Sequence, residues 1–206
     1  MKPVEKKIYL ASKSPRRREL LRQIGIDFEL LLLRSEGPRG ADVTEEVVSG
    51  EDPMAYVARV AAEKAAFAYT LVHRRHLKPR AVLTADTTVT IDGLILGKPA
   101  NHAEAIVMLE QLSGRTHQVL TAIAVQSADF TGQITQVSEV RFGVISPAAI
   151  AAYCATQEPY DKAGGYGIQG LAAQFVEHIE GSHSGIMGLP LFETTQLLRQ
   201  AGLPLP

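Results

Sequence analysis

Near the N-terminus a short apolar run, Ile8–Ala11, is followed within a few residues by a helix start that carries three consecutive arginines. The run predicts a buried strand, and Ser14 followed by Pro15 predicts the N-cap and first turn of a helix. A helix N-terminus already carries partial positive charge, so Arg16–Arg18 concentrate like charge there. A bound polyanion would offset this repulsion, because backbone N–H groups, hydroxyls and guanidiniums would converge on it. A solvated basic first turn is the alternative interpretation.

Helical spacing separates the two sides of this first helix. Leu20, Leu21 and Ile24 follow Arg17 at three, four and seven residues, so they share its face. We therefore expect Arg17 at the rim of the core, where a cleft would lie, and Glu19 in water.

The rest of the chain alternates extended and helical patterns. We expect further strands at 27–33, 81–86 with an extension to 91, 94–96, 118–125, 133–145 and 173–179, helices at 53–77, 101–114, 147–155 and 191–200, and long loops at 34–53 and 158–170. Because strands and helices alternate and some strands form hairpins, the pattern predicts an α/β fold with a mixed sheet. No linker or internal repeat divides the chain, so we expect 1–206 to form a single domain.

Composition indicates which binding partners and which cellular compartment to expect. The net charge of −1 argues against a nucleic-acid-binding protein. No apolar run approaches membrane-spanning length, and the N-terminus lacks the apolar stretch of a signal peptide. The lone Cys154 cannot form an internal disulfide. We therefore expect a cytoplasmic protein that binds neither nucleic acid nor membrane.

Asp86 is the best single candidate for catalysis. It is expected to end an apolar strand, where ligand sites of α/β proteins often lie, and there it could bind a divalent metal or polarise a water. A capping or turn aspartate is the alternative.

Lys98 is placed near Asp86 by the Asp92-Gly93 turn. That turn predicts a hairpin in which Thr87 lies opposite Lys98, on the face away from Asp86 unless irregular backbone next to Lys98 changes the register. An ordinary edge-strand lysine is the alternative.

The glycine-rich loop 158–170 is a third candidate site. Its glycines allow close approach of a ligand, Tyr160 and Tyr166 could stack on a base, and Gln169 could read a base edge with its paired donor and acceptor. A flexible surface loop is the alternative.

Several segments together resemble the Maf family of nucleoside triphosphate pyrophosphatases. They are Leu10-Ala11-Ser12-Lys13-Ser14-Pro15-Arg16-Arg17 with Glu19-Leu20-Leu21, Arg59-Val60-Ala61 with Glu63-Lys64-Ala65, Ala85-Asp86-Thr87 with Leu96-Gly97-Lys98-Pro99, Leu112-Ser113-Gly114 with Thr116-His117, and Tyr160-Asp161-Lys162-Ala163-Gly164 with Tyr166-Gly167-Ile168-Gln169-Gly170. The resemblance extends in order over nearly the whole chain.

The resemblance implies a curved mixed sheet with two lobes and a central cleft, as in inosine triphosphatase-like folds. It implies a homodimer that hydrolyses a nucleoside triphosphate to the monophosphate and pyrophosphate with Mg²⁺, Mn²⁺ or Co²⁺. The third segment resembles members that act on dTTP and UTP. By the same resemblance Asp86 is catalytic and binds metal, and the substrate-binding residues are Ser12, Ser14, Arg16, Arg17, Lys64, Thr87, Lys98, Lys162 and Gln169. Among these, Arg16, Thr87 and Gln169 would govern base selectivity.

The chain departs from the family pattern after the second strand, where two adjacent acids are usual. Ser35-Glu36-Gly37 keeps only the first acid, so we expect Glu36 to be the second metal ligand, unless another acid of that loop takes its place.

Two alternative functions stay open: a pyrophosphatase for another base, such as CTP or 7-methyl-GTP, and a non-catalytic nucleotide-binding regulator of septum formation. The role in the cell would then be either clearing modified nucleotides or restraining division.

Overall fold

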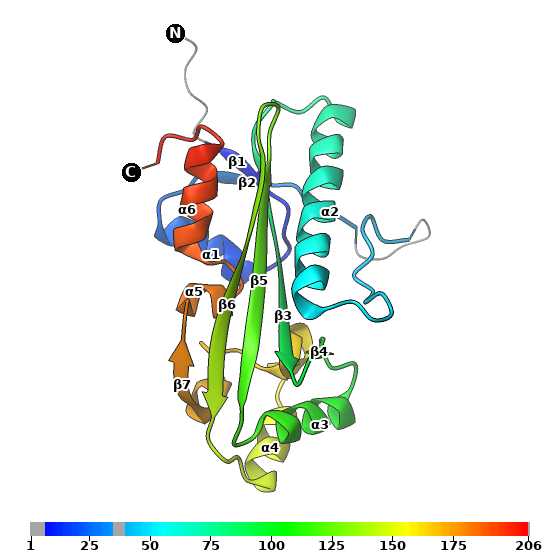
Figure 1. Ribbon diagram of the computed structural model, residues 1–206, viewed down its shortest axis with the longest axis vertical. Coiled ribbons are helices and arrows are strands. Elements are labelled where there is room, and N and C mark those ends of the chain that lie inside the picture. The colour runs from blue at the N-terminus through cyan, green and yellow to red at the C-terminus, as the bar shows by residue number, and fades with distance from the viewer. Residues whose placement is uncertain (1–6, 35–39, 206) are drawn as a thin grey trace.

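A computed structural model describes residues 7–34 and 40–205. A mixed sheet of seven strands runs through them in the order β2-β1-β3-β5-β6-β7, with β4 paired to β3 (Figure 1). The strands are β1 (Ile8–Leu10), β2 (Phe28–Leu30), β3 (Val82–Ile91), β4 (Leu94–Leu96), β5 (Thr116–Gln126), β6 (Thr131–Phe142) and β7 (Val176–Glu180). β1 pairs in parallel with β2 and β3, and all other pairs are antiparallel. The predicted α/β class and mixed sheet are confirmed.

Helices cover both faces of this sheet. They are α1 (Pro15–Gln23), α2 (Pro53–Arg74), α3 (His102–Leu112), α4 (Pro147–Cys154), α5 (His183–Ile186) and α6 (Leu191–Gln200), with 3₁₀ turns at Pro159–Asp161, Ala163–Gly165 and Leu171–Phe175. α2 runs along one side of β3 and β5, α1 and α6 lie on the other, and α3 and α4 close the far end (Figure 1). No helix in the described part of the chain is long and apolar enough to cross a membrane.

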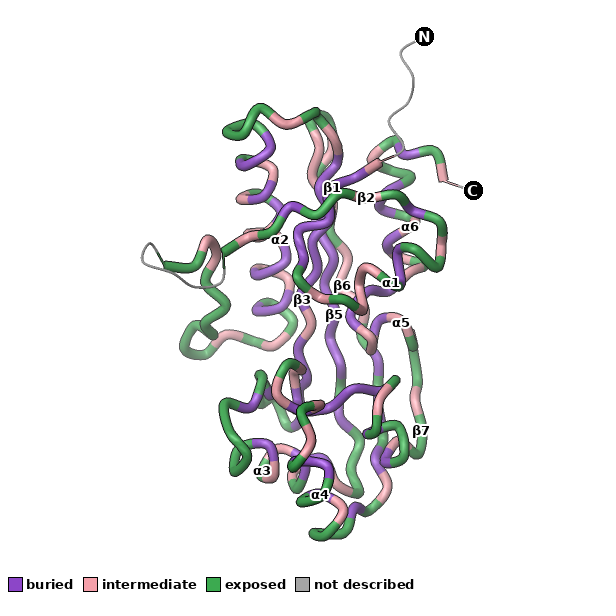
Figure 2. The backbone as a smooth tube through the Cα atoms, turned by 180° about the vertical axis from the view of Figure 1, so that it is seen from behind, coloured by how far each residue is buried: buried purple, intermediate pink, exposed green. Residues whose placement is uncertain are grey.

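The two ends of the sheet carry separate cores. Near α1 and α6, the core contains Leu21, Leu83 and Leu198, whereas near α3 and α4 it contains Leu109 and Phe142. The long strands β3 and β5 pass through both cores and are buried for most of their length (Figure 2). The molecule therefore has two lobes joined by shared strands.

A gap in strand pairing marks the boundary between the lobes. β1 pairs with β3 only at Val82 and Leu83, and β4 pairs with β3 only at Val89–Ile91. Between these points β3 pairs with β5 on its other side alone. The stretch Thr84–Thr88 therefore has one open edge, and side chains from both faces of the strand can reach the space beside it.

Three expectations about the elements are wrong in detail. Asp86 does not end a strand: it lies in the middle of β3, which continues to Ile91 because β5 pairs with it from Val82 to Thr90 and β4 pairs with Ile91. The second strand is shorter than 27–33, and the segment expected as a strand at 173–179 begins with the 3₁₀ turn Leu171–Phe175 before β7. The apolar run predicts burial correctly for β3, whereas Leu30 and Leu32 of the second segment are 43% and 46% exposed. The pairing partner decides where a strand begins and ends.

Candidate active site

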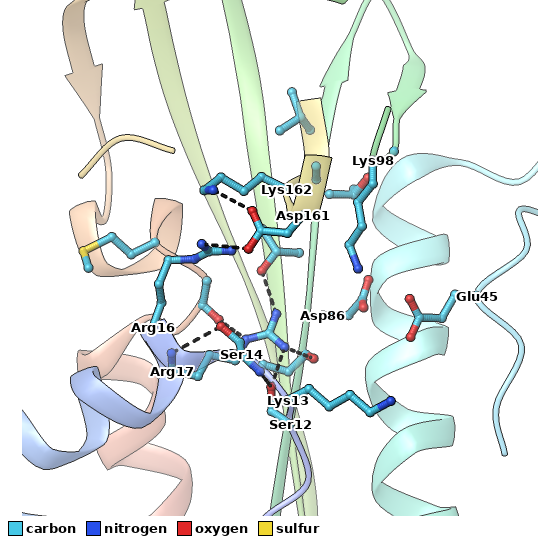
Figure 3. A pocket seen from close by; sticks show the side chains of 18 of the residues that line it. Ser12, Lys13, Ser14, Arg16, Arg17, Glu45, Asp86, Lys98, Asp161 and Lys162 are labelled. Atoms are coloured by element: carbon cyan, nitrogen blue, oxygen red, sulfur yellow. Dashed lines mark hydrogen bonds and ion pairs between the residues drawn. The ribbon is translucent and has the colours of Figure 1, made fainter. Parts of the chain in front are cut away.

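A cleft of about 690 Å³ lies beside the open edge of β3. Its walls come from the start of α1, the middle of α2, the loop before α2, the segment after β4 and the glycine-rich loop (Figure 3). Ten of the residues predicted for the site line it: Ser12, Ser14, Arg16, Arg17, Lys64, Asp86, Thr87, Lys98, Lys162 and Gln169. Glu36 lies outside the described residues.

Two carboxylates converge on one ammonium at the α2 side of the cleft. Lys64 Nζ lies 2.8 Å from Asp86 Oδ1 and 2.8 Å from Glu45 Oε1. The Lys64 and Asp86 side chains are largely buried, whereas the Glu45 side chain is half-exposed. Each carboxylate keeps oxygen lone pairs that Lys64 does not use.

Glu45 is ionised because cations surround it. Burial alone would raise the pKa of its carboxyl, but the charges of Lys64, Lys98 and Arg17 outweigh this and hold the pKa below its usual value. Lys98 points from the segment after β4 toward Asp86 (Figure 3), and it makes no hydrogen bond or ion pair with any described residue. Its ammonium is therefore available to an anion in the cleft.

Regular hairpin pairing, which predicted Lys98 on the face of β3 away from Asp86, does not extend as far as Lys98. Ile91 pairs with Leu94 as predicted, but the ladder stops at the pair of Val89 and Leu96. Lys98 lies beyond the ladder, where the backbone is no longer bound to strand alternation. The irregular backbone around this lysine therefore lets it line the same cleft as Asp86.

Arg17 is anchored by neutral acceptors rather than by a carboxylate. Burial lowers the pKa of its guanidinium, and the charges of Asp86 and Glu45 act against this shift. Four hydrogen bonds fix its position: Nε donates to Gly188 O (2.7 Å), Nη1 to Ala85 O (2.8 Å) and Ser12 Oγ (3.2 Å), and Nη2 to Thr87 Oγ1 (3.1 Å). A guanidinium has five N–H groups, so Arg17 offers the cleft a fixed positive charge with little spare donor capacity.

The start of α1 has the N-cap geometry that its sequence predicts. Ser14 is the N-cap, and its Oγ accepts the Arg17 backbone N–H at 3.4 Å. Ser12 Oγ accepts from the Ser14 backbone N–H and from Arg17 Nη1, both at 3.2 Å. The Ser12 hydroxyl donates to none of the described residues, so its proton is available to a ligand oxygen.

An ion pair joins the two lobes across the cleft. Arg16 Nη1, from α1, lies 3.4 Å from Asp161 Oδ2 in the glycine-rich loop (Figure 3). Lys162 also pairs with Asp161 and donates to Glu158 O at 2.6 Å. Burial alone would raise the pKa of Asp161, but Lys162 and Arg16 hold it below its usual value.

The glycine-rich loop supplies fewer contacts to a base than its composition suggests. Gln169 lines the cleft and is exposed, and its amide makes no hydrogen bond with the described residues. Tyr166 is buried, packs edge-to-face on Phe142 and shares a 2.7 Å hydrogen bond with His117 Nε2. Tyr160 donates to Cys154 O and does not line the cleft. Tyr160 is therefore not placed to stack on a base in the cleft, whereas Tyr166 lines the cleft and its stacking role stays a prediction.

Asp161 was not predicted as a site residue, and Glu45 was covered only by the alternative that another acid of the loop at 34–53 takes the place of Glu36. Glu45 and Glu46 are adjacent acids later in the same loop as Glu36, so the expected acid pair was present there as a signal. Tyr56 on α2 holds this part of the loop by donating to Glu45 O at 2.9 Å, and Arg59 donates to Glu46 O at 3.0 Å.

Asp86 and Glu45 fit a divalent cation that is shared with a substrate. Both carboxylates reach the same ammonium, so a hard cation could bind between them. The described residues contain no group of three or more His, Cys, Asp and Glu that could hold an ion by themselves. This donor set suits Mg²⁺, which is commonly held by one or two carboxylates together with substrate phosphates.

The fold and the site define an α/β protein whose cleft combines cations from several elements, a helix N-terminus and two carboxylates, a set of groups that suits phosphorylated ligands. The family model described as Maf-like protein matches residues 7–201, and the chain belongs to this family.

Curated relatives and one solved structure are similar over nearly the full length. The dTTP/UTP pyrophosphatase of Aromatoleum aromaticum is 55% identical over 207 residues, with 100% of both chains covered. The dTTP/UTP pyrophosphatase of Ralstonia nicotianae is 56% identical, with 96% of this chain and 95% of the relative covered. The structure of the Staphylococcus aureus Ham1 protein is 15% identical with a TM-score of 0.49, and covers 96% of this chain and 100% of that one.

Proposed function

We propose that the protein is a nucleoside triphosphate pyrophosphatase that hydrolyses dTTP and UTP to the monophosphate and pyrophosphate. The convergence of Asp86 and Glu45 on Lys64 beneath Lys98 carries this proposal, because it combines acidic groups for water and metal with cations for phosphates. The dTTP/UTP pyrophosphatases that share more than half of its residues support the choice of substrate.

In this proposal the residues that line the cleft have different roles in binding and catalysis. The Ser12 hydroxyl and Lys98 bind phosphate oxygens, while the partly buried Arg17 supplies a fixed positive charge. Such sites act mainly by positioning and by stabilising charge. Lys64 holds Asp86 and Glu45 in place through its two ion pairs, so neither carboxylate must reorganise during the reaction.

The reaction is a displacement at the α-phosphorus. Asp86 accepts a proton from a water molecule while the oxygen of that water bonds to the α-phosphorus. The bond between the α-phosphorus and the bridging oxygen breaks, and pyrophosphate leaves. A divalent cation such as Mg²⁺, Mn²⁺ or Co²⁺ bound by Asp86 and Glu45 would neutralise phosphate oxygens. Glu45, rather than Glu36, is proposed as the second ligand because it faces Asp86 across Lys64.

We also propose a single functional domain, a cytoplasmic location and a homodimer. The shared strands β3 and β5 support the first of these, since both lobes are needed to form the cleft. The resemblance to the family is the support for the dimer, which analytical ultracentrifugation tests.

A turnover panel tests the function. The protein is incubated with dTTP, UTP, CTP and 7-methyl-GTP in each divalent cation, and pyrophosphate release is measured. We expect dTTP and UTP to be preferred, and ¹⁸O from labelled water to enter the monophosphate. Label in pyrophosphate would contradict attack at the α-phosphorus. A preference for CTP or 7-methyl-GTP would contradict the substrate, and tight binding without turnover in any cation would favour a nucleotide-binding regulator.

A further inference from the structure

Four groups form a continuous series of hydrogen bonds that runs from α1 through the sheet behind the cleft. Arg17 Nη2 donates to Thr87 Oγ1 at 3.1 Å, Thr87 Oγ1 and Thr121 Oγ1 are 3.0 Å apart, and Thr121 Oγ1 donates to Gly185 O at 2.8 Å. Thr87 on β3 and Thr121 on β5 are paired across the ladder. Thr121 is fully buried, while Thr87 is partly exposed and lines the cleft.

The two ends of this hydrogen-bonded series fix which threonine donates in the bond between Thr87 and Thr121. A guanidinium can only donate and a carbonyl can only accept, and each hydroxyl has one proton. Because Thr121 gives its proton to Gly185 O, Thr87 must give its own to Thr121. The reverse order would leave the buried Thr121 oxygen without a donor and would lose one hydrogen bond inside the protein, which is unfavourable.

The Thr87 hydroxyl therefore differs from the Ser12 hydroxyl in the same cleft. Ser12 accepts two hydrogen bonds and keeps its proton for a ligand oxygen. Thr87 has committed its proton and one lone pair, so only a lone pair remains for a ligand. A phosphate oxygen suits the position of Ser12 but would meet an acceptor at Thr87. The part of a ligand that contacts Thr87 must offer an N–H or O–H.

We propose that Thr121 is a positioning residue that holds the Thr87 hydroxyl as a hydrogen-bond acceptor, so that the cleft selects a pyrimidine with a ring N–H. This inference rests on the proposed hydrolysis of dTTP and UTP. Uracil and thymine carry N–H at N3, whereas cytosine has an unprotonated acceptor nitrogen at the same place. Uracil is therefore selected over cytosine. When N3 of cytosine faces the Thr87 oxygen, two acceptors meet, so no hydrogen bond forms and both atoms are left desolvated.

Thr121→Val is the direct test. The variant keeps the branched shape, and Gly185 O retains the Gly188 backbone N–H at 2.8 Å. Thr87 is then free to turn its proton into the cleft and can donate to cytosine. Calorimetric binding of UMP and CMP, and kcat/KM for UTP and CTP, are measured for wild type and variant. We expect the preference for the uracil nucleotide to fall about tenfold, the effect of roughly one hydrogen bond on affinity.

Two control variants separate positioning from general damage. Thr121→Ser keeps the hydroxyl and should retain the wild-type preference. Thr90→Val removes a buried hydroxyl that has no partner among the described residues, and should also leave the preference unchanged. A purely structural role of Thr121 would lower binding of UMP and CMP equally, which would overturn the proposal.

A ligand variant tests the same point without changing the protein. N3-methyluridine monophosphate lacks the N–H, and wild type should bind it at least about tenfold more weakly than UMP. Equal binding of the two would overturn the inference even if Thr121→Val does not fold. If wild type prefers UMP to CMP but hydrolyses neither dTTP nor UTP, the proposed function fails while this inference stands. If it hydrolyses UTP and Thr121→Val keeps the wild-type preference, the inference alone fails.

Discussion

The guanidinium of Arg17 donates to the carbonyl oxygen of Ala85 at 2.8 Å, at the place where β3 has no neighbouring strand on that side. A side chain thus binds a backbone group that a further strand would otherwise bind. Unpaired backbone groups at a strand edge are costly when buried. Arg17 therefore allows the gap between β1 and β4 to exist, and the cleft occupies that gap.

Arg17→Lys should destabilise the protein although it conserves the charge. A lysine has three donors on a flexible stem and cannot reach Ala85 O and Gly188 O together as the planar guanidinium does. We expect the free energy of unfolding to fall by about 2–4 kcal/mol, since hydrogen bonds to charged groups contribute about 1.5–3 kcal/mol each and are not additive. Urea denaturation measures the change. Arg22→Lys, at an exposed position of α1, is the matched control, and equal stability of the two variants would refute the role of Arg17.

Asp86→Asn should lower pyrophosphate release by about 10²–10⁴-fold, the usual contribution of a general base. Asparagine keeps the shape of the side chain and can accept from Lys64, so the fold should persist, but it cannot take a proton from water. Circular dichroism and steady-state kinetics are measured together. Asp92→Asn alters an exposed aspartate that pairs with Arg115 in the hairpin turn, and should leave turnover near wild type. Turnover of Asp86→Asn near that of the control would remove Asp86 from its proposed role.

Local sequence rules predicted the start of the site well. Ser14 caps α1, Pro15 occupies the first turn, and Leu20 and Leu21 are buried beneath the helix as their spacing indicates. These features depend on residues within one or two turns of each other, so spacing alone is sufficient to predict them. The bounds of α6 were predicted for the same reason.

Long-range pairing accounts for what the sequence did not predict. The apolar pattern predicted β3, but the gap between β1 and β4 depends on where two distant strands stop. Glu45 reaches the cleft because Tyr56 and Arg59 of α2 hold its loop by backbone carbonyls. No periodic pattern in a polar loop indicates such contacts. The adjacent acids Glu45 and Glu46 were the only local sign.

Glu45→Gln tests which acid completes the pair with Asp86. Removing this charge deletes one of the two ion pairs of Lys64 and one candidate metal ligand. We expect turnover to fall by about 10–100-fold and the Mg²⁺ or Mn²⁺ concentration needed for half activity to rise, in line with typical effects of altered metal sites. Glu46→Gln and Glu36→Gln are the comparison variants, and both should keep the metal dependence of wild type. A larger loss in Glu36→Gln than in Glu45→Gln would restore the original assignment of Glu36.

The buried His117 predicts how stability depends on pH. Burial lowers the pKa of this imidazole from 6.5 to about 4, so in the folded protein it stays neutral and pairs with the Tyr166 hydroxyl. The unfolded chain takes up the proton first as the pH falls. Stability is therefore fully present above pH 6.5 and is lost progressively as the pH falls from 6.5 to about 4. The loss should reach about 3 kcal/mol, at about 1.4 kcal/mol for each pKa unit.

Urea denaturation at a series of pH values measures this dependence in wild type, His117→Asn and His178→Asn. The first variant removes the buried imidazole, and the second removes an exposed imidazole on β7. We expect His117→Asn to be less stable at pH 7 but to lose much less stability on acidification, because it has no imidazole to protonate at this site. His178→Asn should follow the wild-type profile. Parallel profiles for wild type and His117→Asn would mean that carboxylates such as Glu45 and Asp161, whose pKa values are lowered, dominate the acid response instead.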